Sequence, residues 1–171
     1  MSESETSFIL APTIEDKDIL ELAVDTRSFE ISLFWQRSNY FLILNTALAV
    51  GFFRTSGLTS LGLALFGFLT SLIWYRVCLG SKFWQSRWEQ RLAKAEQRVA
   101  PNLGFFAAEW SLVYADVQAS VAGSGHKGFF RKWIDRQILK KPSVSYNMII
   151  LSMLFMAGWA CIAGIKFLVP Q

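Results

Sequence analysis

The chain has 171 residues, of which 53% are apolar and only 18% are charged, below the roughly 25% that is usual in soluble domains. Its two cysteines lie in or beside apolar runs and its histidine is single, so the sequence favours neither a disulfide framework nor a metal site. The net charge is +4, but residues 1–39 carry a net −5 and residues 76–147 a net +7.

The N-terminal segment, residues 1–30, is acidic. Its first twelve residues lack the positive stretch followed by an apolar run that marks a signal peptide. Thr13 and Asp16 then resemble a capping box, and apolar residues recur behind them. We expect residues 1–30 to form an acidic cytoplasmic arm that contains a short amphipathic helix.

Two long apolar runs follow, separated by the short polar turn Arg54-Thr55-Ser56-Gly57. Runs of this length predict a transmembrane helical hairpin over residues 31–79. The clean apolar part of the first run, residues 40–53, is too short for a hydrocarbon core of roughly 30 Å. We therefore begin the first span at Ile31, which brings polar residues into the bilayer.

Those polar residues give two interpretations. In the first, Arg37 reaches lipid headgroups and Asn45 bonds a neighbouring helix. In the second, several copies of the span turn a polar face toward a common axis and line a water-filled path. Three spans in one chain cannot enclose a pore, so the second interpretation requires an oligomer. The candidate pore-lining residues are Gln36, Arg37, Ser38, Asn39, Asn45 and Thr46.

The second span, residues 58–79, carries small residues at helical spacing. Small side chains let helices approach closely in lipid, where packing replaces the hydrophobic effect. The third span, residues 148–169, also has a small-residue face. The predicted helix-packing residues are Ser60, Ala64, Gly67, Ser71, Ala160 and Gly164.

Residues 80–141 predict a basic cytoplasmic helical subdomain. We expect helices over residues 81–100, 105–121 and 129–139, with Pro101 ending the first. Glu96 alternates with basic residues, which is typical of a solvated face. The positive-inside rule accounts for the basic charge, so nucleic-acid binding is disfavoured. The expected contacts to headgroups or to a cytoplasmic protein partner are Arg131, Lys132, Arg136, Lys140 and Lys141.

The glycine-rich loop of residues 123–128 formally matches the dinucleotide-binding pattern, but no strand precedes it. A weak anion-binding loop of Gly125, His126 and Lys127 is the alternative to a plain connection. No pair of tuned acid and base groups is evident. We expect no enzyme activity, no catalytic residue and no cofactor.

Residues 142–171 contain the C-terminal transmembrane helix. The fold class we predict is all-α: an integral membrane protein with three transmembrane helices, a hairpin plus a C-terminal span, and a small cytoplasmic helical subdomain. Charge counting places the N-terminus and residues 80–141 in the cytoplasm and the C-terminus in the periplasm.

Three aromatic-rich motifs, Phe34-Trp35-Gln36-Arg37-Ser38-Asn39-Tyr40-Phe41, Gly80-Ser81-Lys82-Phe83-Trp84-Gln85 with Arg87-Trp88-Glu89, and Lys141-Pro142-Ser143-Val144-Ser145, occur together. They resemble the RipA family of small bacterial inner-membrane proteins, from about Glu30 onward. The resemblance implies an octameric membrane assembly related to pore-forming accessory proteins of some RNA-targeting CRISPR systems. It implies no catalytic residues.

The function we predict is an oligomeric, ring-shaped pore or channel in the bacterial inner membrane that affects permeability in stress or phage defence. Two alternatives stay open. One is a non-conducting scaffold that recruits a cytoplasmic partner. The other is a membrane protein that binds lipid or a small ligand.

Overall fold

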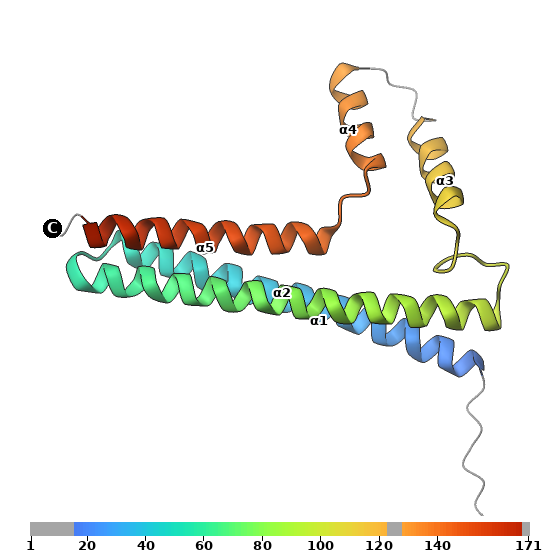
Figure 1. Cartoon of the computed structure of the whole chain (residues 1–171), viewed down its shortest axis with the longest axis horizontal. Helices are drawn as coiled ribbons and strands as arrows, with labels where there is room; N and C mark the ends of the chain where they lie inside the picture. The colour runs from blue at the N-terminus through green and yellow to red at the C-terminus, as the bar shows by residue number, and fades with distance from the viewer. Residues whose placement is uncertain (1–15, 123–127, 169–171) are drawn as a thin grey trace, which may run out of the picture.

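The computed structural model describes residues 16–122 and 128–168, and every element in these ranges is a helix (Figure 1). The all-α prediction is therefore confirmed. In chain order the helices are α1 (Asp16–Phe53), α2 (Gly57–Val99), α3 (Trp110–Ala122), α4 (Phe129–Leu139) and α5 (Val144–Leu168).

Helices α1 and α2 form a long hairpin. The turn between them lies at residues 54–56, where the polar run Arg54-Thr55-Ser56 interrupts the apolar sequence. Helix α2 has 43 residues and continues through Gly80, where we expected one helix to give way to another. A single glycine costs a helix only about 1 kcal/mol, and Gly80 has no proline beside it, so the helix propagates. Helix α2 ends at Val99, just before Pro101.

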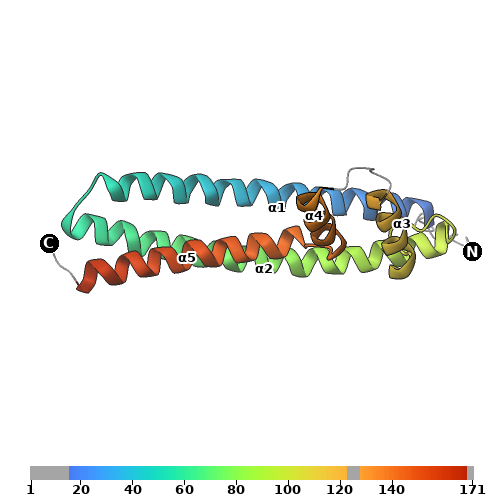
Figure 2. The same ribbon diagram turned by 90° about the horizontal axis from the view of Figure 1, so that it is seen from above.

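Helix α2 is the central helix of the bundle. Both α1 and α5 pack along it, while the backbones of α1 and α5 make few close contacts with each other (Figures 1 and 2). Aromatic rings fill the seam: Trp74 is fully buried, stacks on Phe41 at 6.0 Å and lies 5.8 Å from Phe155. One residue from each of the three helices thus meets at the same level.

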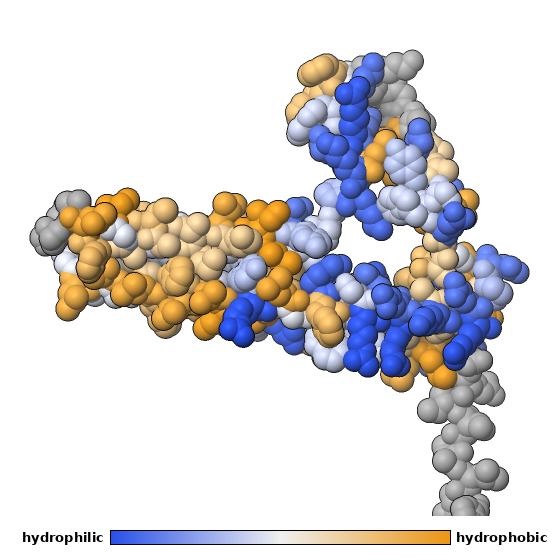
Figure 3. Space-filling model, in the orientation of Figure 1, coloured by the Kyte–Doolittle hydropathy of each residue, from blue (hydrophilic) through white to orange (hydrophobic). Residues whose placement is uncertain are grey.

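The bundle has an apolar half and a polar half (Figure 3). The apolar half holds α5 and the ends of α1 and α2 near their turn. Helices α2 and α5 are long and apolar enough to cross a membrane, whereas α1, which carries Gln36 to Asn39 next to its apolar run, is not among those that qualify in the described ranges. At 1.5 Å per residue, α2 is about 64 Å long, about twice a hydrocarbon core. Its second half therefore projects beyond the apolar region.

Helices α3 and α4 pack against each other and stand away from the bundle (Figure 1). We call this pair the α3–α4 arm. It is joined to the bundle by residues 100–109 and by residues 140–143. Helix α3 begins at Trp110, later than the predicted start at Phe105. The backbone N–H groups of residues 105–107, before the helix, bond a side chain of α2.

Candidate functional site: faces of a membrane bundle

A polar cluster joins all three bundle helices in the apolar half. Asn45 of α1 is fully buried, and its Oδ1 accepts hydrogen bonds from Ser71 Oγ of α2 and Trp159 Nε1 of α5, both at 2.9 Å. Its Nδ2 donates to the Phe41 carbonyl at 2.9 Å. The amide is thus satisfied within its own chain, as lipid demands of a polar group.

This cluster corrects the predicted pore lining. The structure places Asn45 and Ser38 inside the protomer, with 0% and 2% of their surfaces exposed, so neither faces a shared axis. The interpretation in which Asn45 bonds neighbouring helices is the one that the geometry matches. The six candidate pore-lining residues therefore do not share one face of α1, because Ser38 and Asn45 are buried and the other four are exposed.

Most of the exposed candidate pore-lining residues lie on a separate, outward face of α1. Gln36, Asn39 and Thr46, together with Ser32, recur at spacings that keep them on one outward face, whereas exposed Arg37 lies off that face. Gln36 Nε2 donates to Ser32 Oγ at 3.3 Å and Thr46 Oγ1 to the carbonyl of Leu42 in the same helix. None of these bonds reaches another helix. We call Ser32, Gln36, Asn39 and Thr46 the outward polar stripe.

The small residues of α2 lie at the helix–helix contacts. Ser60, Ala64, Gly67 and Ser71 are all buried. Gly67 supports the indole of Trp159 directly, because a Cβ at Gly67 would overlap the indole ring. The close approach of α2 and α5 therefore depends on the missing side chain.

The small residues of α5 lie on the opposite side of that helix. Ala160 and Gly164, with Ala157 and Cys161, are exposed on the surface of the bundle. A Cβ at Gly164 would meet open space among the described residues. We call these four residues the small face of α5. They do not pack within the protomer, in contrast to the small residues of α2.

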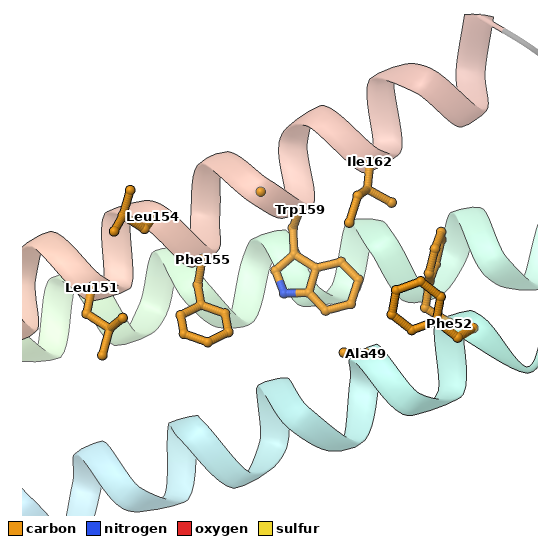
Figure 4. A pocket seen from close by; sticks show the side chains of 9 residues that line it. Ala49, Phe52, Leu151, Leu154, Phe155, Trp159 and Ile162 are labelled. Carbon is orange, nitrogen blue, oxygen red and sulfur yellow. The ribbon is translucent and has the colours of Figure 1, made fainter.

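A cavity of about 320 Å³ lies between α1 and α5 in the apolar half (Figure 4). Trp159 points from α5 into this space, beside Phe155 and Ile162, and Ala49 and Phe52 of α1 close the other side. The lining is almost entirely apolar. The cavity reflects the sparse contact between α1 and α5.

Helix α4 presents an exposed amphipathic surface. None of its residues is buried, and Phe129, Phe130 and Trp133 are all exposed, Phe129 by 91%. Beside them are the exposed residues predicted to contact headgroups or a partner: Arg131, Lys132, Arg136, Lys140 and Lys141. Arg131 Nε lies 3.7 Å from Asp135 Oδ1. Lys141 Nζ lies 4.4 Å from the centroid of the Trp110 ring. The predicted anion loop of Gly125, His126 and Lys127 lies outside the described residues.

Glu96 corrects the prediction of a solvated charge. Its side chain is only 2% exposed, and its carboxylate accepts 2.7 Å hydrogen bonds from the N–H groups of Phe105, Phe106 and Ala107. Burial raises the pKa of Glu96, but these three hydrogen bonds outweigh it, so the pKa lies below its usual value. Sequence reasoning missed this residue because an isolated Glu between basic residues does not reveal which loop folds over it.

These features define a helical membrane protein: long apolar helices, a buried polar cluster that meets its own hydrogen-bond needs, and small residues at close helix contacts. The chain belongs to the octameric membrane protein family (8xMP), whose family model matches residues 17–168. The match begins before Glu30 and so includes part of the acidic arm that the resemblance left out. No curated protein and no solved structure matches the chain.

Proposed function

We propose that eight copies of this chain form a ring in the bacterial inner membrane and that α1 faces the ring axis. The observation that carries the proposal is the outward polar stripe. In lipid, the exposed Asn39 amide would lie against hydrocarbon at a free-energy cost, whereas the Thr46 hydroxyl already bonds the Leu42 carbonyl. A ring that turns this face inward gives the stripe water or the polar groups of other copies.

In this arrangement all three long helices span the bilayer. Helix α1 alone is too polar to qualify as an isolated span, but a span at a water-filled axis needs one apolar side only. By the positive-inside rule, the polar half and the α3–α4 arm lie in the cytoplasm and the C-terminus in the periplasm. The small face of α5 then meets a neighbouring protomer, because small residues allow close helix approach in lipid.

The role is a non-enzymatic one: a pore or channel that changes membrane permeability. Its use in stress or phage defence, and a relation to the RipA family and to CRISPR accessory pores, follow from the motif resemblance alone.

The test is ion flux from liposomes that contain the purified protein, with its mass measured under native conditions. We expect octamers that conduct, and we expect Asn39→Leu with Thr46→Leu to reduce the flux severalfold while the octamer mass is kept. Gly62→Ala, an exposed site on α2 with open space around it, is the silent control. A monomeric mass, or a flux that the double variant leaves unchanged, would contradict the pore.

The exposed surface of α4 favours a second candidate, a non-conducting scaffold. Its apolar and basic residues are exposed and suit headgroups or a cytoplasmic protein. Octamers that fail to conduct, and that lose a cytoplasmic partner when Phe129 and Trp133 are both replaced by Ser, would favour the scaffold over the pore.

A further inference from the structure

A cavity of about 730 Å³ lies where the apolar and polar halves of the bundle meet. Four segments line it: α1 near Arg27, α2 near Lys82, the connection from α2 to α3, and the connection from α4 into the first turn of α5. Both connections of the α3–α4 arm therefore border the same space. An occupant of this cavity touches the bundle and both ends of the arm.

The charged side chains that line the cavity have a net charge of +1. Arg27, Lys82 and Lys141 face Glu30 and Glu89 across it. The single ion pair that joins them is long, because Arg27 Nη2 lies 3.9 Å from Glu89 Oε1. The Nε of Arg27 is buried without an acceptor in the described structure. The lining thus has one uncompensated positive charge and an unused buried donor.

Neutral donors lie beside these cations. Gln85 accepts a 2.7 Å hydrogen bond from Ser145 Oγ through its Oε1, which leaves its NH₂ group available to donate. The first turn of α5, from Val144, borders the cavity and contains no acidic residue. The positive end of this 25-residue helix therefore adds to the attraction for an anion.

The remaining walls are aromatic and held in place. Phe34, Trp35 and Trp88 come from the hairpin, and Phe105 and Phe106 come from the connection to α3. The backbone of that connection is fixed by the buried Glu96 carboxylate. The site therefore exists without its occupant, and its apolar walls suit an organic group attached to the anion.

We propose that this cavity binds a phosphodiester monoanion. One negative charge matches the net charge of the lining, and phosphate oxygens suit Arg and Lys donors that converge from separate segments. Inorganic phosphate would leave most of the volume and all of the aromatic wall unused. The same chemistry is found in an anionic phospholipid headgroup, which reaches the site from the bilayer surface, and in a soluble phosphodiester.

The proposal rests on the membrane placement of α2 and α5 given above. It is tested with the full chain in detergent mixed with phosphatidylglycerol or with zwitterionic phosphatidylcholine, and retained lipid is counted by native mass spectrometry. We expect the chain to retain phosphatidylglycerol in preference. Lys82→Gln should weaken retention about tenfold, the loss of one charge-assisted contact.

Lys94→Gln is the matched control, since Lys94 is an exposed lysine of the same helix outside this cavity. Lys141→Gln carries the same expectation as Lys82→Gln and replaces it if circular dichroism shows that Lys82→Gln does not fold. Equal retention of the two lipids, or equal losses in the cavity and control variants, would overturn the site.

Glycerophosphoglycerol, the same headgroup without acyl chains, distinguishes the two sources. Binding of this probe to the full chain, measured by titration calorimetry and weakened about tenfold in Lys82→Gln, assigns the site to a soluble phosphodiester as well. Retention of phosphatidylglycerol without a response to the soluble probe assigns it to lipid alone. The octamer mass is read in the same spectra, so an octamer without lipid contradicts this inference while the proposed ring stands.

Discussion

The indole Nε1 of Trp159 donates a 2.9 Å hydrogen bond to Oδ1 of Asn45, two residues that lie 114 positions apart in the sequence. Both side chains are buried, and Ser71 Oγ completes the cluster at 2.9 Å from the same oxygen. The bond ties the C-terminal helix to the first helix although their backbones make little contact. It adds to the contact between the Phe52 and Trp159 rings, which joins the same two helices.

Replacing Asn45 tests this tie. Asn45→Ala leaves the Trp159 N–H buried without an acceptor, so we expect the free energy of unfolding to fall by about 1 to 3 kcal/mol. The measurement is unfolding in mixed micelles by titration with dodecyl sulfate. Thr46→Ala is the control, because Thr46 is exposed and bonds only its own helix, and its unfolding should match the parent chain. Equal effects at the two positions would contradict the cluster.

Gly67 and Gly62 form a matched pair on α2. We expect Gly67→Ala to lower the free energy of unfolding by about 1 to 3 kcal/mol, because the new methyl group must displace the Trp159 indole. Gly62→Ala meets open space among the described residues and removes a flexible helical residue, so it should be neutral or stabilising by about 0.5 kcal/mol. Thermal melting in detergent decides between them, and a neutral Gly67→Ala would show that α5 does not rest there.

Glu96 predicts a pH dependence. Its pKa is lowered in the folded chain, so its contribution to stability is complete above the ordinary value of 4.5 and is lost as the pH falls through the lower, folded-state pKa. Glu96→Gln should melt at a lower temperature than the parent chain at pH 7, since one neutral oxygen replaces a carboxylate that accepts three bonds. We expect the difference to shrink below pH 4.5. A difference that stays constant with pH would mean that the carboxylate charge does not hold the connection.

The small face of α5 predicts where assembly is sensitive to size. Gly164→Leu should disrupt the octamer and leave the helical content of the chain unchanged, because its side chain enters a contact between copies. Gly158→Leu, an exposed glycine of the same helix that borders the cavity between α1 and α5, should keep the octamer. Native mass spectrometry and circular dichroism give the two readouts. Octamers in both variants would place the interface elsewhere.

Much of the bundle was predictable because lipid imposes simple rules. Apolar run lengths predicted the helical, membrane-embedded character, and the polar Arg54-Thr55-Ser56 run predicted the turn. The spacing of Ser60, Ala64, Gly67 and Ser71 predicted one face of α2, and the structure places all four in its contacts. Periodicity along one helix is a local property that a sequence displays directly.

Properties that depend on partners far along the chain were not predictable. Periodicity grouped Asn45 with Asn39, but only the position of Trp159 shows that one points inward and the other outward. Glu96 resembled a surface acid until the fold placed three amide groups against it. The cavity near Arg27 and Lys82 has walls from four separated segments, and no window of sequence contains them together.

Because α2 continues through Gly80 as one helix, it connects the apolar and polar halves of the bundle directly. One continuous hydrogen-bonded helix runs from Gly57 to Val99, so a displacement of one end of the helix affects the other end. In the proposed membrane arrangement, a force on the charged end of α2, whether from the arm or from a bound protein, would tilt or rotate the end that carries Gly67 and Ser71.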